Sequence, residues 1–494
     1  MPKRSAVYTL ILPPRDPETP AYLWLCAALR AEILEGRLRP GARLPATRDL
    51  AEQYGLSRGT IVAGFEQLKS EGYVRGSTGS GTFVNATIPD DFMQVRRAGG
   101  VSAAAGQSPR RRVSAFARRV SPFPDSGHRA IRAFRANEPA LELFPSALWA
   151  RVASRRLRRV SAELLRGCAP QGYPPLRQAV ADYLGAARGV KCTAEHVIIL
   201  SGTQEALDLS ARLLLDVGSR ACVEDPGYWG AALAFTSAGA RISTVRVDDE
   251  GMTVPSARLR GARLVYVTPA HQFPLGTTMS LPRRLELLEW ARASGALIFE
   301  DDYDGEYRYS GHPIPALQGL DRHGLVLFSG SFSKVLFPSL RLGYLVVPPD
   351  LVERFANVVS IGTRHASLIE QAVLCDFITE GHFGRHLRRM REVYAGRLRL
   401  LMEGARRELA GLLELTGVEA GLQVAGWLHE GIDDQAATRA AALRDVEVMP
   451  LSGYSRRRMA RQGLQLGFAA VDEREIKRGM TELARALEGM ARRR

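Results

Sequence analysis

A lysine that follows two closely spaced serines is the part of this sequence best suited to chemistry. Lys334 follows Ser331 and Ser333, and Arg341 lies seven positions further on. The ε-amine of a lysine can condense with an aldehyde to form a Schiff base, while hydroxyl groups and a guanidinium can hold a phosphate. Pyridoxal 5'-phosphate (PLP) requires both. We therefore predict that Lys334 forms a Schiff base with PLP and that Ser331, Ser333 and Arg341 hold its phosphate.

Lysine is rare in this chain, which makes Lys334 harder to dismiss as a solvated cation. Of the 67 Lys and Arg residues, the lysines are Lys3, Lys69, Lys191, Lys334 and Lys477. Arginine cannot form an imine. A surface lysine in a serine-rich loop is the alternative interpretation of such a motif.

Two further segments offer groups that bind the phosphate and the ring of PLP. The run Gly202-Thr203-Gln204 follows an apolar strand and opens a helix. Backbone N–H groups and the helix dipole favour an anion at that position. Tyr228 follows another strand and can stack on a pyridine ring. An ordinary turn and a core tyrosine are the alternatives.

An acidic segment offers partners for the polar atoms of the PLP ring. Asp301 and Tyr303 come directly after the apolar strand 297–299. A carboxylate there can bond the protonated ring nitrogen, and the tyrosine can donate to the phenolic oxygen. Taken alone, these residues also fit an acidic loop beyond a strand.

Residues 20–85 have the pattern of a small DNA-binding unit. Apolar spacing predicts a helix that stops at Gly36, a second helix over 46–54 and a third over 58–71 with Ser57 as its N-cap. A glycine-rich hairpin follows. Two short helices and a hairpin in this order predict a winged helix-turn-helix.

Five polar residues of this unit are placed for contact with duplex DNA. The start of the third helix presents Ser57, Arg58 and Thr60, which suit base edges and phosphates in the major groove. Arg48 in the preceding helix and Arg75 at the wing suit phosphate contacts. For any single arginine, a solvated helix face is an equal alternative.

The charge of the chain favours a polyanionic partner. The net charge is +15 and the pI is near 10.0, which point most simply to nucleic acid and leave an anionic membrane surface open. No apolar run approaches the roughly 20 residues needed to span a bilayer, and a signal-peptide pattern is missing. The five cysteines are scattered without metal-ligand spacing. We therefore predict a cytoplasmic protein without a metal site.

The 494 residues suggest two or three domains. We predict a winged helix-turn-helix over 18–86, a flexible basic linker over 87–130 and an α/β domain with a mostly parallel sheet over 131–494. In this last domain the expected strands are 197–200, 264–267, 297–299 and 325–328, and the expected helices include 281–293 and 364–401.

Several motifs resemble known families. The stretches 38–51, 55–60, 71–74 and 79–84 resemble the GntR-type winged helix. The order Gly-Thr-Gln, Pro-Gly-Tyr, His-Gln-Phe-Pro-Leu-Gly, Asp-Asp-Tyr, Ser-x-Ser-Lys and Arg resembles class I aminotransferases of fold type I. Together, over nearly the whole chain, they resemble the MocR family of transcriptional regulators, which includes GabR- and PdxR-like members. This resemblance implies a PLP-bound homodimer with swapped domains, in which effector binding repositions DNA-binding heads.

Two positions depart from the aminotransferase pattern. Gln465 stands where these enzymes carry an arginine that clamps the substrate carboxylate, and Gly167 stands near the position of a tyrosine that reaches the partner's phosphate. We therefore predict a regulator that senses PLP, an amine or an amino acid. A PLP-dependent aminotransferase with residual or genuine activity and a dimerisation scaffold with an empty pocket remain alternatives.

Overall fold

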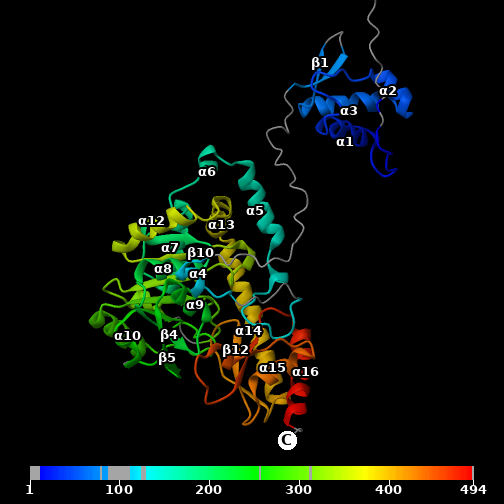
Figure 1. Cartoon of the computed structure of the whole chain (residues 1–494). Helices are drawn as coiled ribbons and strands as arrows, with labels where there is room; N and C mark the ends of the chain where they lie inside the picture. Colours follow the sequence, from blue (N-terminus) through cyan, green and yellow to red (C-terminus); the bar gives the residue numbers. More distant parts are fainter. Residues whose placement is uncertain are drawn as a thin grey trace, which may run out of the picture. The chain divides into compact units, whose positions relative to one another are not determined.

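The computed structural model describes residues 10, 12–77, 81–86, 112–123, 130–254, 257–310 and 314–491. The chain divides into two compact units, Met1–Arg111 and Arg112–Arg494. We call the first unit the head and the second unit the body (Figure 1).

The head consists of three helices and a two-stranded hairpin. Its elements are α1 (Ala21–Leu34), α2 (Thr47–Tyr54), α3 (Arg58–Ser70), β1 (Val74–Ser77) and β2 (Gly81–Val84). The two strands pair antiparallel. All three helices and the hairpin contribute to one apolar core, which includes Leu25, Leu29, Leu50, Ile61, Leu68 and Val84. The predicted winged helix-turn-helix is confirmed.

Two local signals set the turn between α2 and α3. Gly55 ends α2 with a φ of 63°, in the left-handed region that glycine adopts without a steric penalty. Ser57 then caps α3, because its side chain accepts a hydrogen bond from the Thr60 N–H at 3.1 Å. The third helix therefore begins where the sequence predicts it.

The body is built on an eight-stranded mixed sheet. The strand order is β3-β10-β9-β8-β7-β4-β5-β6. The strands from β9 to β5 in this order run parallel, whereas β10 is antiparallel to both of its neighbours. The bounds are β3 (Val197–Leu200), β4 (Arg220–Asp225), β5 (Arg241–Asp248), β6 (Gly251–Met252), β7 (Ala262–Val267), β8 (Leu297–Asp302), β9 (Val326–Ser331) and β10 (Gly343–Val346). The predicted mostly parallel sheet is confirmed.

Helices cover both faces of this sheet. On one face α7, α10, α13 and α14 contribute to the apolar cores, and on the other face α8, α9 and α12 do so. The helices of the body are α4 (Ala115–Arg119), α5 (Ser146–Arg158), α6 (Ala162–Arg166), α7 (Pro174–Arg188), α8 (Thr203–Leu214), α9 (Trp229–Ala238), α10 (Leu281–Ser294), α11 (Leu317–Leu320), α12 (Val352–Gly362), α13 (Leu368–Thr379), α14 (His382–Glu408), α15 (Asp434–Ala442) and α16 (Glu473–Ala491).

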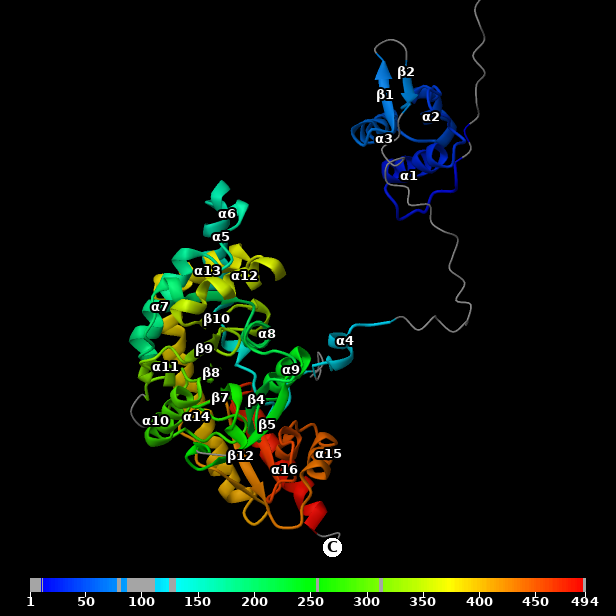
Figure 2. The ribbon, with the colours of Figure 1, turned by 60° about the vertical axis from the view of Figure 1, so that its left-hand side comes forward.

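A smaller antiparallel sheet forms the C-terminal part of the body. Its order is β11-β12-β14-β13, with the bounds Leu413–Leu415, Gln423–Leu428, Gly463–Gly467 and Met449–Pro450. α14 and α16 pack on each other beside it (Figure 2). The buried residues of this sheet belong to the same core as one face of the large sheet.

One prediction about the elements needs correction, and a second concerns a stretch that the structure describes only in part. The helix predicted over 364–401 is two helices, α13 and α14, because Gly381 has a φ of 76° and breaks the helical path. Of the predicted linker over 87–130, the structure describes only 112–123 and 130. The stretch 112–123 contains α4, which packs against α9 of the body. Every residue of this stretch except Arg119 is nevertheless exposed, and the remainder of the linker lies outside the described residues.

Candidate functional site

One cavity of the body contains every residue that the sequence predicts for the cofactor. Its volume is about 370 Å³, and it lies where β4, β8 and β9 end and α8 begins. The carboxyl ends of parallel strands are the usual place for ligands in such sheets. The predicted residues in its lining are Gly202, Thr203, Gln204, Tyr228, Asp301, Tyr303, Ser331, Ser333, Lys334 and Arg341.

Lys334 enters the cavity from the turn after β9. Its Nζ donates a hydrogen bond to the backbone oxygen of Asn137 at 2.5 Å. Burial lowers the pKa of Lys334, and the nearby carboxylates of Glu138 and Asp304 oppose this shift. A lowered pKa raises the fraction of neutral amine, which is the nucleophilic form. The position therefore suits condensation with an aldehyde.

Asp301 lies at the end of β8 and is almost fully buried. Its Oδ2 accepts a hydrogen bond from the Tyr266 hydroxyl at 2.8 Å, and its Oδ1 lies 3.4 Å from the Thr203 Oγ1. Burial raises the pKa of Asp301 from 3.8 to about 7, against the opposing effect of the Tyr266 hydrogen bond. A buried carboxyl of this kind gains most from a cationic partner, such as a protonated ring nitrogen.

Asp301 gives the cofactor-free protein a pH-dependent stability that can be measured. Since its folded pKa is raised to about 7, the native state holds one more proton than the unfolded state between about pH 4 and 7. This stabilisation is fully present below about pH 4 and is lost, at about 1.4 kcal/mol per pH unit, as the pH rises from about 4 to 7. Burial also raises the pKa of Glu224, Glu300 and Glu306 to about 7. We therefore expect the free energy of urea unfolding between pH 5 and 7 to fall with pH less steeply in Asp301→Asn than in wild type, by about 1.4 kcal/mol per pH unit.

The matched control for this experiment is Asp216→Asn, which changes an exposed aspartate of the body. It should keep the wild-type slope. Equal slopes in wild type and Asp301→Asn would refute the raised pKa.

The residues predicted for the phosphate meet at the opening of α8. Gly202 precedes the first turn of α8, and Gly343 of β10 lies against it, because a Cβ added to Gly343 would be 2.8 Å from the Gly202 Cα. The Ser331 hydroxyl accepts a hydrogen bond from the Ser333 N–H at 3.2 Å. Arg341 is exposed at the same cavity. This arrangement forms an anion cradle with one guanidinium.

Tyr228 and Gln204 form one wall of the cavity. The Tyr228 hydroxyl donates to the Gln204 Oε1 at 3.3 Å, and the Gln204 Nε2 donates to the backbone oxygen of Gly230 at 3.1 Å. The Tyr228 ring lies 5.9 Å from the Phe273 ring, nearly perpendicular to it. The Gln204 side chain thus uses both of its polar atoms in hydrogen bonds, one of which holds Tyr228. The backbone N–H of Gln204 is the group that can bind an anion.

Tyr303 belongs to a buried polar network behind the cavity. Its hydroxyl lies 3.0 Å from the His271 Nδ1 and 3.4 Å from the Gln423 Nε2. The same His271 nitrogen lies 3.0 Å from Asp304. Burial raises the pKa of Tyr303, so its hydroxyl stays protonated. It can therefore donate a hydrogen bond into the cavity.

The structure adds lining residues that the sequence analysis missed. Arg135 and Glu447 form an ion pair with 2.9 Å between Nε and Oε2 at the cavity edge. The other lining residues outside the predictions are Phe123, Ala136, Asn137, Glu138, Trp229, Tyr266, Phe273, Pro338, Met449 and Tyr454. Two signals were available: Phe273 lies in the His-Gln-Phe-Pro-Leu-Gly motif, and the cluster Arg135-Ala-Asn-Glu138 precedes a proline.

The two positions that depart from the enzyme pattern lie outside the cavity lining. Gln465 is fully buried on β14, and its Oε1 accepts a hydrogen bond from the Tyr454 hydroxyl at 2.9 Å. It therefore lies behind Tyr454. Gly167 has a φ of 110°, and a Cβ at this position would lie 3.0 Å from the His365 Nε2.

The head presents all five predicted DNA-contact residues on its surface. Arg58 begins α3 and is exposed, as are Arg48 in α2 and Arg75 in β1. Ser57 and Thr60 lie at the start of α3, with 2.8 Å between their hydroxyls. The Ser57 hydroxyl is partly used in capping α3. The first turn of α3 is thus an exposed polar helix end that Ser57 caps.

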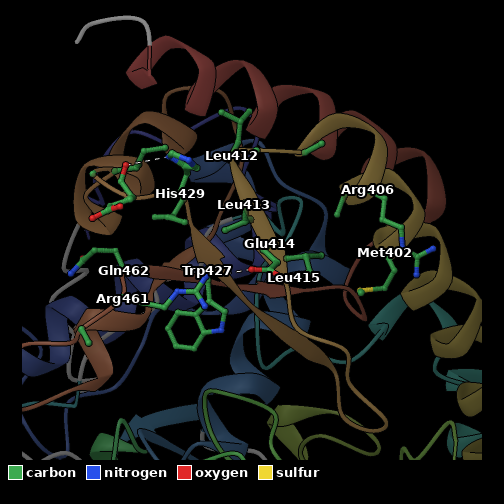
Figure 3. Close-up of a pocket in the computed structure, with 18 residues that line it drawn as sticks. Met402, Arg406, Leu412, Leu413, Glu414, Leu415, Trp427, His429, Arg461 and Gln462 are labelled. Atoms are coloured by element: carbon green, nitrogen blue, oxygen red, sulfur yellow. Dashed lines mark hydrogen bonds and ion pairs between the residues drawn. The ribbon is translucent and has the colours of Figure 1, made fainter.

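A larger pocket in the small sheet contains none of the predicted residues. It has a volume of about 800 Å³ and lies beside β11 and the end of α14. There the Arg461 guanidinium lies over the Trp427 ring, 5.3 Å from its centroid (Figure 3). Among the described residues, no helix is long and apolar enough to cross a membrane, and no group of three or more His, Cys, Asp or Glu is placed to hold a metal.

Comparison with known proteins assigns both units. Residues 22–84 match the model of the gntR family of bacterial regulatory proteins, and residues 134–483 match aminotransferase class I and II. The chain is 41% identical to the "Probable rhizopine catabolism regulatory protein MocR" of Rhizobium meliloti, over 96% of this chain and 94% of that protein. It is 30% identical to the pyridoxine biosynthesis regulator PdxR of Corynebacterium glutamicum, over 97% and 98%.

The body is also similar to solved aminotransferase structures. LysN, the alpha-aminoadipate aminotransferase of Thermus thermophilus, in complex with N-(5'-phosphopyridoxyl)-L-leucine, aligns with a TM-score of 0.67 and 31% identity. The alignment covers 73% of this chain and 93% of LysN. The chain belongs to the MocR family of transcriptional regulators, in which a GntR-type winged helix-turn-helix is joined to a fold type I aminotransferase-like domain.

Proposed function

We propose that this regulator binds PLP through a Schiff base with Lys334 and changes its DNA binding when PLP, an amine or an amino acid occupies the body. One observation carries the proposal: a single cavity holds Lys334 with a lowered pKa, the buried carboxyl of Asp301 and the basic cradle around Arg341. These three groups match an aldehyde, a protonated ring nitrogen and a phosphate.

The residues of the cavity fit PLP, and each has a stated task. Asp301 would hold the ring nitrogen, Tyr303 would donate to the phenolic oxygen, and Tyr228 would cover the ring. The phosphate would lie at the opening of α8 beside Ser331, Ser333 and Arg341. When bound, PLP supplies an electrophilic aldehyde and an electron sink. The chain's own residues orient it and keep the Lys334 nitrogen available.

The proposal extends to the organisation of the protein. We place the DNA-binding domain at 18–86, the connecting linker at 87–130 and the effector domain at 131–494. We expect a homodimer in the cytoplasm, with duplex DNA as the partner of the head. The exposed residues Arg58 and Arg75 support the DNA partner, because they add positive charge around the first turn of α3 and the wing.

An aminotransferase is the second candidate function, and the similarity to LysN favours it. The body carries a complete set of predicted PLP residues in one cavity. However, an arginine clamp is missing at position 465, where a buried glutamine bonds to Tyr454. Loss of a charge-assisted bond to a carboxylate costs about 1.5–3 kcal/mol. Steady turnover of an amino donor with a 2-oxo acid would establish this second function.

A titration that follows two signals at once tests the proposed function. PLP is added to the protein, with and without candidate amines, while the visible absorption of the imine and the affinity for DNA are recorded together. We expect the absorption to appear and the DNA affinity to change at the same PLP concentration. Imine absorption with an unchanged DNA affinity under every ligand would refute the sensing role.

A further inference from the structure

Residues 113–123, which we call the strap, lie against the body. The strap contains α4, which contacts α9 (Figure 2). The Arg119 Nε donates a hydrogen bond to the backbone oxygen of Ser237, near the end of α9, at 3.2 Å. A cation at the C-terminal end of a helix is favourable.

The end of the strap reaches the Lys334 cavity. The Phe123 ring stacks on the Trp229 ring, with 5.7 Å between centroids and 25° between planes. Its centroid lies 6.4 Å from that of Tyr228. All three side chains line the cavity. Phe123 is therefore part of the cavity wall, next to the tyrosine that is expected to cover the PLP ring.

The strap is held weakly. Its large apolar side chains keep about half of their surface exposed: Val113 52%, Phe116 46%, Val120 47% and Phe123 50%. A helix of five residues has little stability of its own. Half-buried side chains also gain only part of the free energy of full burial. The docked and released states of the strap thus differ by a small free energy, which a ligand can shift.

We propose that the strap closes the outer side of the Lys334 cavity and that an occupant of the cavity and the docked strap stabilise each other. This inference rests on the proposed function, because it assigns the regulation of the same site. The cavity keeps about 370 Å³ with Phe123 already in its wall, so an occupant gains contact with Phe123 without displacing it. Since the strap is part of the chain between head and body, its docking couples the cavity to the head.

Coupling of this kind is reciprocal. If an occupant raises the equilibrium constant for strap docking by a certain factor, the docked strap raises the affinity for the occupant by the same factor. Loss of the docked strap therefore lowers that affinity by this factor. An aromatic pair such as Phe123 and Trp229 contributes enough free energy to change the docking equilibrium of the strap about three- to tenfold. The size of the expected effect is therefore within reach of binding and proteolysis measurements.

The test compares Phe123→Ala with Phe116→Ala in the full-length protein. Phe116 is a matched control, because it is an equally exposed phenylalanine of the same strap that does not line the cavity. The probes are PLP and N-(5'-phosphopyridoxyl)-L-leucine. The readouts are probe affinity, the rate of tryptic cleavage after Arg118 and Arg119, and the ratio of DNA affinities with and without PLP.

We expect both probes to slow cleavage in wild type by about three- to tenfold. Phe123→Ala should weaken probe binding by a similar factor, lose the protection and bring the ratio of DNA affinities close to one. Phe116→Ala should weaken probe binding less than Phe123→Ala does, because Phe116 does not line the cavity. The inference is overturned if PLP binds wild type and Phe123→Ala equally and leaves cleavage unchanged. If PLP does not bind wild type at all, the proposed function itself fails, which is a distinguishable result.

Discussion

Lys334→Ala is expected to abolish covalent attachment of PLP completely. Treatment of wild type with PLP and borohydride should place one pyridoxyl label on each chain, at the Lys334 Nζ, because burial lowers the pKa of that amine and the turn after β9 directs it into the cavity. In the variant the label should be missing. Intact-mass measurement followed by peptide mapping checks this result, and the imine absorption should disappear with the label.

The remaining residues of the cavity should still bind PLP weakly without the covalent bond. The anion cradle around Arg341 and the Asp301 carboxyl stay in place in Lys334→Ala, so weak, non-covalent PLP binding should persist. Lys191→Ala is the matched control, since Lys191 is exposed and only its backbone atoms bond to Gln318. It should keep the full label. A label that persists in Lys334→Ala, or that maps to Lys191 in wild type, would contradict the assignment.

The sequence predicted the parts of the site that depend on residue type. Lys334 with its serines, and Asp301 at the end of an apolar strand, follow from chemistry that only these side chains can perform. The fold then brings them together because parallel strands end at one edge of the sheet. In the head, Ser57 was predictable for the same reason, since a serine before an apolar helical pattern satisfies free N–H groups.

The parts that could not be predicted depend on long-range contacts. The partner of Lys334 is a backbone oxygen at Asn137, and any residue type could supply it. Phe123 lies in a stretch rich in alanine, serine and arginine, and its place in the cavity wall comes from packing on Trp229. The break at Gly381 was hidden because apolar residues on both sides keep a helical spacing.

Arg58→Ala is expected to lower the DNA sequence discrimination of the head. Arg58 is the first residue of α3, and it is exposed beside the capped first turn. In a winged helix this position faces base edges in the major groove, where one good contact of an arginine is worth about 1–3 kcal/mol. We therefore expect the affinity for a selected duplex to fall about 5- to 150-fold while the affinity for a shuffled duplex changes little.

Arg75→Ala separates base contacts from general charge effects in the same experiment. Arg75 is an exposed arginine of β1, predicted to contact phosphate. Its removal should weaken binding to selected and shuffled duplexes alike and lower the slope of log affinity against log salt by about one. The selected duplex is obtained from a random pool with wild-type protein, and both affinities are measured over a salt series. If Arg58→Ala behaves like Arg75→Ala, with equal losses on both duplexes, then the base-contact role is wrong and the arginine serves only the phosphate backbone.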